Sequence, residues 1–269
     1  MTNGNNHGKE DTRPFAAPCR RLAANAPLRW IAAGWRDYKA SPGISLAYGL
    51  IVFGVSLGVS LLAWELGSYV LVISMLSGFI FVAPLLATGM YSVSRQLGRG
   101  KSVSFARSVK RMHLALRDAL VFALVLLVIF LVWVRAGVMV HVFFPAGESH
   151  DLMLLLRFLG IGSAVGSIFA LVTFSAAAFS LPMIVDRDAD MVTACITSVN
   201  AVLRNKPAMA VWIALIVALT GLGFATAGLG LIVVIPLLGY ATWHGYVETI
   251  DAAAWPDSAT QNEPVKGER

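Results

Sequence analysis

Histidine and carboxylate side chains, which could bind a metal or transfer protons, are few in this chain and match no known catalytic or metal-binding spacing. Of the five histidines, only His141 and His244 lie near apolar segments, and they should lie toward opposite faces of the membrane. Two such histidines cannot share one axial-ligand site. His141, Glu148, His150 and Asp151 are ligand types, but their spacing matches no metal motif. We therefore expect no metal, no cofactor and no catalytic residues.

Three polar residues, Arg135, Glu65 and His244, lie within apolar segments or at their ends. A membrane-buried charge is a functional candidate by default. A long arginine side chain can also extend to the lipid headgroups, however. For Arg135 we favour that interpretation, or a structural pair with Glu65. His244 lies beside Trp243 and close to Tyr246, and aromatic neighbours of this kind indicate a residue at the membrane interface.

The acidic run from Asp186 to Asp190 resembles part of a cation site. A calcium loop, however, needs Gly at its sixth position and Glu at its twelfth, and Met191 and Thr197 hold those positions here. Asp188 or Asp190 is better suited to begin a helix, because carboxylates stabilise its positive end. We therefore predict a helix start in this run.

The composition indicates lipid as the solvent for most of the chain. Of the 269 residues, 57% are hydrophobic and 13% are charged, and the mean hydropathy is +0.73. A soluble domain carries about 25% charged residues. In lipid, unpaired backbone groups cost several kcal/mol each, so the spanning segments should be helices. The sequence therefore predicts an all-α, polytopic membrane protein, and it contains no Walker A motif, dinucleotide fingerprint or nucleophile elbow that would indicate an enzyme.

Six apolar stretches are long enough to cross a hydrocarbon layer of about 30 Å. They run from about Ile44 to Trp64, Tyr69 to Val93, Asp118 to His141, Phe158 to Val185, Ala208 to Ala225 and Gly228 to Tyr246. The last two are joined by a tight glycine-rich turn and should form a hairpin.

The basic residues predict the orientation of these spans. Seven lie in the segment that ends at Lys39, seven between the second and third spans, three between the fourth and fifth, and two in the C-terminal tail. Nineteen of the 21 basic residues are thus on one side. The positive-inside rule then places both termini in the cytoplasm of a multi-pass protein of the bacterial inner membrane.

Three prolines recur at matching positions of the second, fourth and sixth spans: Pro84, Pro182 and Pro236. With the preceding segments they define three parallel helical-hairpin repeats. Each proline removes one backbone hydrogen bond and predicts a kink. The kinked helices either shape the packing or line a shared cavity. The glycine pairs Gly54–Gly58 and Gly162–Gly166 predict close helix approach within the bundle.

Each repeat begins with an amphipathic lead-in helix. The predicted apolar stripes are Leu28-Ile31-Trp35-Tyr38, Phe105-Val109-Met112-Leu116 and Val192-Cys195-Val199-Val202. The first two helices are also basic, through Arg29, Arg36, Lys39, Arg107, Lys110 and Arg111. Such helices either lie at the membrane interface among anionic headgroups or cap the bundle through protein contacts.

Several of these motifs together resemble one bacterial family. The motifs are Gly34-Trp-Arg-Asp-Tyr-Lys-Ala-Ser-Pro-Gly, Phe81-Val-Ala-Pro-Leu-Leu-Ala, Phe179-Ser-Leu-Pro-Met-Ile and Ile235-Pro-Leu-Leu-Gly-Tyr. They are similar to the predicted integral membrane proteins called domain of unknown function 2189, over roughly residues 28–250. The resemblance implies a six-span inner-membrane protein and brings no catalytic residues. Some relatives carry a cytochrome c oxidase label, which the two separated histidines do not support.

The resulting prediction is a membrane domain at residues 28–251 between two disordered cytoplasmic tails, residues 1–27 and 252–269. We expect a non-enzymatic accessory or scaffold protein whose partners are the bilayer, its anionic headgroups and a membrane protein, with no nucleic acid. The alternative is a small transporter or channel with a cavity between the three proline-kinked helices.

Overall fold

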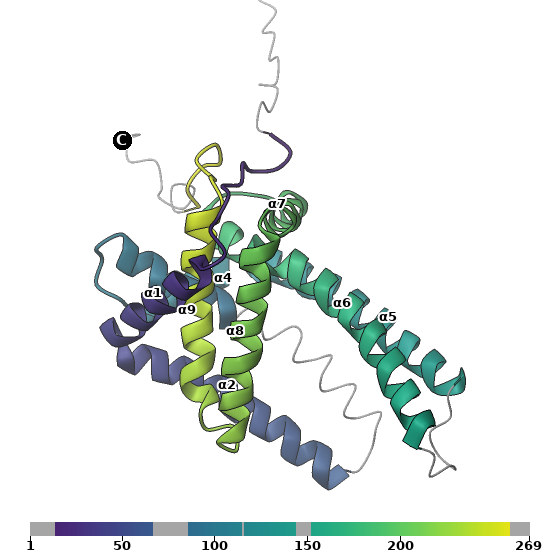
Figure 1. Cartoon of the computed structure of the whole chain (residues 1–269). Helices are drawn as coiled ribbons and strands as arrows, with labels where there is room; N and C mark the ends of the chain where they lie inside the picture. The colour runs from purple at the N-terminus through teal and green to yellow at the C-terminus, as the bar shows by residue number, and fades with distance from the viewer. Residues whose placement is uncertain (1–13, 67–85, 115, 144–151, 259–269) are drawn as a thin grey trace, which may run out of the picture.

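The computed structural model describes residues 14–66, 86–114, 116–143 and 152–258, and within these ranges the regular secondary structure is helical apart from two isolated β-bridges (Figure 1). A helix at residues 86–98 lies between α2 and α4. The other helices are α1 (Ala26–Ala40), α2 (Pro42–Leu66), α4 (Phe105–Leu114), α5 (Leu116–Phe143), α6 (Leu152–Asp186), α7 (Met191–Arg204), α8 (Lys206–Ala225) and α9 (Leu231–Thr249).

Four helices are long and apolar enough to cross a membrane. Their candidate spans are Pro42–Leu62, Leu116–Met139, Gly160–Asp186 and Lys206–Ala225. These agree with the first, third, fourth and fifth predicted spans. Most of the second predicted span falls at residues 67–85, outside the described residues.

The sixth predicted span corresponds to α9, which is not among the four candidates. Its N-terminal half is aliphatic, but its C-terminal half contains Trp243, His244 and Glu248. These polar and aromatic side chains lower the mean hydropathy of α9. Two of them, His244 and Glu248, contact α1.

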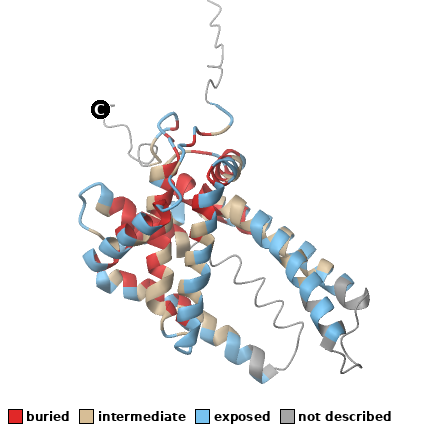
Figure 2. Ribbon diagram, viewed as in Figure 1, coloured by how far each residue is buried: buried red, intermediate tan, exposed pale blue. Residues whose placement is uncertain are grey.

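The buried core lies at one end of the molecule, where α1, α7, α9 and the end of α6 meet (Figure 2). Trp30 of α1 is its centre and is only 1% exposed. Its ring makes edge contacts with Trp212 at 5.5 Å and with Phe179 at 6.1 Å between ring centroids. From this core, α5 and α6 extend away side by side, with much of their surface exposed (Figures 1 and 2).

The buried faces of the lead-in helices differ in part from the predicted stripes: small residues join large ones such as Trp30 and Tyr38 in the contacts, and several large apolar residues are exposed. The buried faces are Trp30, Ala33, Gly34 and Tyr38 in α1, Ser108 in α4, and Thr193, Ala194, Thr197, Ser198 and Ala201 in α7, among others. Leu28, Trp35, Phe105, Val109 and Val192 are exposed. Small residues let helix backbones approach closely, which explains why they are common on the buried faces.

Close helix approach also occurs at different glycines from those predicted. A Cβ at Gly49 of α2 would lie 1.9 Å from the Ile232 carbonyl oxygen of α9, and one at Gly34 would lie 2.8 Å from the Ala241 nitrogen. Gly54 and Gly58 have no neighbour within 4 Å among the described residues. The approach predicted at Gly54–Gly58 is thus not seen among the described residues, whereas a Cβ at Gly166 would lie 3.6 Å from Trp133 Nε1 of α5.

The inner parts of both predicted tails are packed against the core. In the N-terminal segment, Cys19 is buried, and the Asn205 amide accepts a hydrogen bond from Leu22 N at 2.8 Å and donates one to Arg20 O at 3.0 Å. In the C-terminal segment, Trp255 is buried and Pro256 O accepts from Asp188 N at 2.9 Å. These contacts correct the expectation of free tails for residues 14–27 and 252–258.

Candidate functional site

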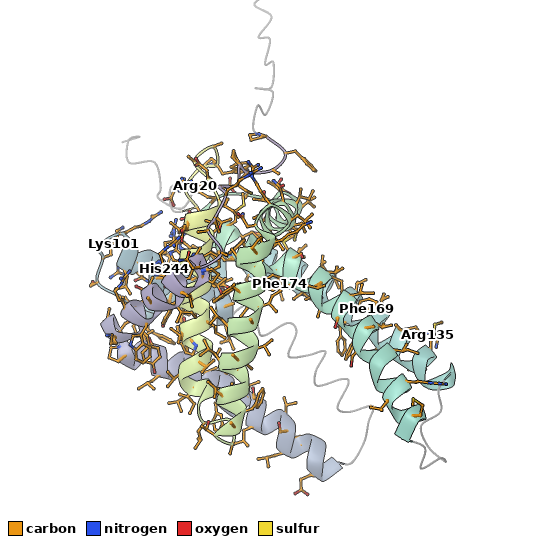
Figure 3. The ribbon with its side chains drawn as sticks, viewed as in Figure 1. Arg20, Lys101, Arg135, Phe169, Phe174 and His244 are labelled. Atoms are coloured by element: carbon orange, nitrogen blue, oxygen red, sulfur yellow. The ribbon has the colours of Figure 1, made fainter. Side chains whose placement is uncertain are left out.

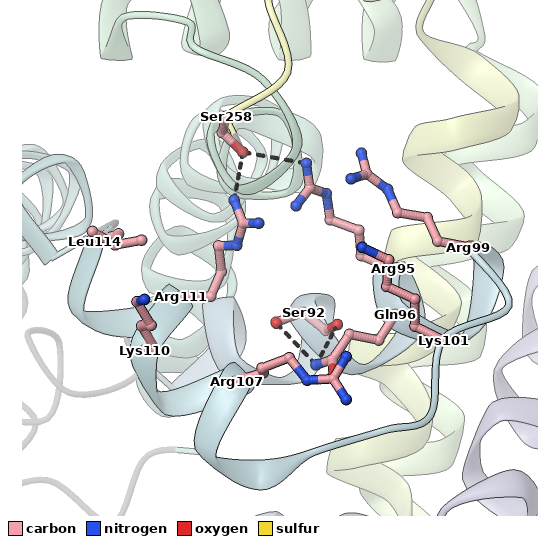
Figure 4. Close-up of a pocket in the computed structure, with 10 residues that line it drawn as sticks. All are labelled: Ser92, Arg95, Gln96, Arg99, Lys101, Arg107, Lys110, Arg111, Leu114 and Ser258. Atoms are coloured by element: carbon pink, nitrogen blue, oxygen red, sulfur yellow. Dashed lines mark hydrogen bonds between the residues drawn. The ribbon is translucent and has the colours of Figure 1, made fainter. Parts of the chain in front are cut away.

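Three of the predicted interfacial cations come together in a single pocket. Arg107, Lys110 and Arg111, all on α4, line a cavity of about 300 Å³ (Figure 4). The remaining lining residues are Ser92, Arg95, Gln96, Arg99, Lys101, Leu114 and Ser258. We call this cavity the basic pocket.

The side chain of Gln96 joins two walls of the basic pocket. Its amide nitrogen donates to Ser108 Oγ at 3.1 Å and to Ser92 O at 3.2 Å, and its amide oxygen accepts from Ser104 N at 3.1 Å. The chain between the walls turns at Gly100, whose φ of +64° is a conformation that favours glycine at a helix end. Gln96 therefore holds α4 against the helix at residues 86–98.

Two carboxylates balance the deeper arginines of the basic pocket. Arg95 is 5% exposed, and its Nε donates to Asp186 Oδ1 at 3.0 Å while its Nη2 donates to Asp257 Oδ1 at 2.5 Å. Arg99 also pairs with Asp257, and Tyr246 Oη donates to Asp186 Oδ2 at 3.1 Å. These contacts join α6, α9 and the C-terminal segment to the helix at residues 86–98.

Arg111 forms no ion pair with a carboxylate among the described residues. Its Nη1 donates to Ser258 Oγ at 2.8 Å. Burial, followed by repulsion from Arg95 and Arg99 and offset in part by Asp257, lowers the pKa of Arg111 to about 10. Arg111 thus remains a cation at neutral pH in surroundings that are already positively charged.

The predicted cations of α1 lie outside the basic pocket. Arg29 pairs with Glu248 of α9, which also accepts a hydrogen bond from Trp30 Nε1 at 2.7 Å. Arg36 and Lys39 are exposed. Of the six predicted interfacial cations, one therefore joins α1 to α9, two face the surroundings and three share the pocket.

The polar residues predicted near the ends of spans are not brought together. Figure 3 shows Arg135 far along α5 from the core and His244 close to it. His244 Nε2 lies 2.8 Å from Asp37 Oδ2 and so connects α9 with α1, a pairing that the sequence analysis missed. Arg135 and Glu65 are both exposed, and no ion pair between them occurs in the described part of the chain.

Two of the three predicted prolines lie inside helices, and Pro84 lies outside the described residues. Near Pro182, Ser198 Oγ of α7 accepts from Phe179 N at 3.0 Å and donates to Ser175 O at 2.7 Å. A side chain thus bridges the backbone of α6 one turn before the proline. Pro236 cannot donate to Ile232 O, the oxygen that lies against Gly49.

A second, apolar hollow of about 500 Å³ lies between α5 and α6. Phe169 and Phe174 of α6, both labelled in Figure 3, line it together with Phe130 and Trp133 of α5. It lies within two candidate spans, so its chemistry suits hydrocarbon rather than a charged solute.

The sequence analysis used Arg95, Arg99 and Lys101 only to assign orientation, and it did not identify Asp257 or Ser258 as neighbours of Arg95. These two residues follow Arg95 by more than 160 positions. No local pattern reports such a contact. The proximity of Arg107, Lys110 and Arg111 could be predicted, because spacings of three and four place residues on one helix face.

Comparison with known proteins agrees with the sequence resemblance. No curated protein and no solved structure matches the chain. The family described as predicted integral membrane protein (DUF2189) matches residues 71–186, which include the basic walls of the pocket, α5 and α6. Over these residues the chain is similar to the DUF2189 family of predicted integral membrane proteins, whose function is unknown.

Proposed function

We propose that this protein is a non-enzymatic accessory or scaffold protein of the bacterial inner membrane. Its polar end would lie at the cytoplasmic surface, in contact with anionic lipid headgroups and with a membrane-protein partner. The observation that carries the proposal is the division of α1 and α4 into a buried face and an exposed face. Each buries one face in protein contacts, around Trp30 and Gly34 in α1 and at Ser108 in α4, while cations and other large apolar side chains remain exposed together.

Exposed apolar and basic residues on one helix suit the boundary between headgroups and acyl chains. On α1 the exposed set includes Leu28, Trp35, Arg36 and Lys39. On α4 it includes Phe105, Val109 and Lys110. The proposal therefore combines the two interpretations of the lead-in helices: one face caps the bundle through protein contacts, and the other faces the lipid.

The proposed topology has six spans in three parallel hairpin repeats. The order of elements supports it, since a shorter helix directly precedes each of the apolar helices α2, α5 and α8. In this topology α9 is the sixth span, and the second lies mainly at residues 69–85. Both terminal segments pack at the polar end, which agrees with two cytoplasmic termini.

A structural role for the ionisable groups supports a non-enzymatic function. Asp186, Asp37 and Glu248 each form an ion pair or hydrogen bond that joins separate helices. Such contacts hold the fold together and leave these groups committed to packing. Because these groups join helices, they support a scaffold whose polar end is held together by ion pairs.

The test is purification of the full chain from gently solubilised membranes, with mass spectrometry of co-purifying proteins and lipids. We expect a specific protein or an anionic lipid that is lost from Trp35→Ala, because Trp35 is exposed on the lipid-facing side of α1. Phe15→Ala, which removes another exposed aromatic side chain away from α1, should retain it. Recovery of no specific component in several detergents would contradict the proposal.

The second candidate is a small transporter or channel, which is favoured by the buried positions of Pro182 and Pro236 inside α6 and α9. It requires a water-accessible path beside these prolines. In a protein without its two native cysteines, Ile235→Cys should then react with a membrane-impermeant thiol reagent. Val217→Cys, on the exposed face of α8, should not react. Equal protection of both positions would exclude this candidate.

A further inference from the structure

We infer that the basic pocket binds a phosphate group, carried either by an anionic lipid headgroup or by a soluble phosphate. The inference deepens the proposed function and rests on it for the position of the pocket at the cytoplasmic membrane surface. It adds a specific site and a chemical class of ligand, which a scaffold does not require.

The first argument is the charge balance of the basic pocket. Six cationic side chains line it, and the carboxylates that pair with them in the described part of the chain are Asp186 and Asp257. Both carboxylates pair with Arg95 and Arg99. Four lining cations therefore have no carboxylate partner within the described ranges: Lys101, Arg107, Lys110 and Arg111.

The second argument is the arrangement of these cations. Arg107, Lys110 and Arg111 follow spacings of three and four on α4, so three like charges share one helix face. Like charges at these spacings destabilise a helix unless an anion lies between them. Figure 4 shows Arg107 and Arg111 on α4 and Arg95 on the helix at residues 86–98 lining the same pocket.

The third argument is the fit between these groups and a phosphate. Guanidinium groups donate paired hydrogen bonds to phosphate oxygens, and lysine adds a point charge. Ser258 Oγ already holds Arg111 and Arg95, at 2.8 and 3.3 Å, and so fixes the direction of two guanidinium groups. Arginines whose orientation is set in advance lose less side-chain freedom when a ligand binds.

The position of the pocket allows a lipid to supply the phosphate. Leu114, which is exposed, lines the pocket, and α5 with its candidate span begins at Leu116. A headgroup in the pocket would therefore place the glycerol and acyl chains beside the start of a span. A soluble phosphate would use the same cations without this apolar edge.

The experiment uses the full chain purified in a neutral detergent. Native mass spectrometry measures retention of phosphatidylglycerol against phosphatidylcholine, and thermal melting measures stabilisation by inorganic phosphate. The test variant is Arg107→Gln combined with Lys110→Gln. The matched control is Arg36→Gln combined with Lys39→Gln, which removes two exposed cations from α1. All four side chains are exposed, and each variant removes a like-charge pair at a spacing of three, so the ligand-free melting temperature should not fall in either variant.

We expect the test variant to bind about fivefold more weakly for each cation removed, and the control to stay within about twofold. Selective retention of phosphatidylglycerol identifies a lipid as the source, whereas stabilisation by phosphate without lipid selectivity identifies a soluble ligand. If the test variant unfolds, Lys101→Gln with Lys110→Gln replaces it. Equal weakening in the α1 control, or no binding of either probe to the unmodified chain, overturns the inference. Continued recovery of a Trp35-dependent partner in that case would leave the proposed function intact.

Discussion

At the scale of single residues, Asp186 connects more elements than any other carboxylate discussed above. It lies at the end of α6 and accepts from Arg95, Arg187 and Tyr246. Because Arg95 is almost fully buried, losing one of its two carboxylate partners leaves Asp257 alone to compensate its charge. We expect Asp186→Asn to lower the free energy of unfolding by about 3 kcal/mol, measured by denaturant unfolding in detergent.

Asp251→Asn is the control for this prediction. Asp251 lies 3.8 Å from Arg20, with both side chains about half exposed, and such surface pairs contribute about 0–1 kcal/mol. A loss in Asp186→Asn no larger than that in Asp251→Asn would show that the buried network contributes little to stability.

Asp190 is the N-cap of α7, as the acidic run predicted. Its side chain accepts from Thr193 N at 2.9 Å. Burial alone would raise the pKa of Asp190, but hydrogen bonds from Thr193 and Val192 outweigh it and lower that pKa. The cap therefore stabilises the fold above the ordinary aspartate pKa of about 3.9, and this contribution is lost as pH falls through the lowered value.

We accordingly expect Asp190→Ala to cost about 1 kcal/mol at neutral pH, because the first turn of α7 loses its cap. The difference from the unmodified chain should disappear in strong acid, when the carboxyl group is protonated. Melting curves at several pH values measure both effects. Asp190→Asn should keep most of the stability and lose the pH dependence, so a variant that behaves like Asp190→Ala would count against the cap.

At the scale of elements, close contact between helices depends on glycine positions, where the absence of a Cβ lets two backbones meet. Gly49 of α2 lies against Ile232 O, an oxygen that Pro236 leaves without its usual donor. A methyl group at Gly49 would meet this oxygen at 1.9 Å and must push α2 away from α9. We expect Gly49→Ala to cost about 2–3 kcal/mol, visible as a lower melting temperature.

Gly54→Ala is the matched control in the same helix, since nothing among the described residues lies within 4 Å of a Cβ there. That substitution should be neutral or slightly stabilising, because alanine favours a helix more than glycine does. Equal effects of the two substitutions would argue against a close contact of α2 with α9.

Docking of the N-terminal segment can be followed through Cys19. Burial raises the pKa of the Cys19 thiol, and the positive charge of Arg204 offsets part of this rise. The thiolate is the reactive form, so a raised pKa slows the reaction. In a Cys195→Ser background we expect slow labelling by maleimide. Asn205→Ala should accelerate it, because Asn205 holds Arg20 and Leu22. Asn25→Ala, which removes an exposed side chain without a capping bond, should not.

At the scale of the whole molecule, the described structure has a packed polar end and apolar helices that extend from it (Figure 2). The proposed topology places this end in the cytoplasm. Alkaline phosphatase, which is active only outside the cytoplasm, should therefore be inactive when fused after Arg269 and active when fused at position 147, in the predicted outer loop. The reverse pattern would refute the orientation and move the basic pocket to the other membrane surface.

Several features of this protein could be predicted from the sequence because they depend on local properties. Four of the six predicted spans correspond to apolar helices, since twenty apolar residues in a row are a property of the chain itself. The cap at Asp190 was predictable for the same reason, and so was the shared face of Arg107, Lys110 and Arg111. The remaining two spans are not among the candidates, one because it lies mostly outside the described residues and the other because α9 mixes aliphatic and polar positions.

The faces of the lead-in helices were not predictable by the same reasoning. Hydrophobicity pointed to Leu28 and Trp35, but in lipid a large apolar side chain gains little from leaving the solvent. Small residues such as Gly34 in α1 and Ala194 in α7 therefore share the buried faces with Trp30, Tyr38 and Val202. Which small residue meets which helix depends on the partner, and the partner is distant in sequence.

By itself, then, the sequence determined the helical class and four of the apolar helices that could cross a membrane. Only the tertiary structure decided that Asp257 and Ser258 meet Arg95, that the two terminal segments are docked, and that six cations share a hollow of about 300 Å³. The physical reason is the separation along the chain between the residues that interact. Hydropathy and helix periodicity act between neighbours along the chain, whereas ion pairs and close backbone contacts depend on how distant helices pack.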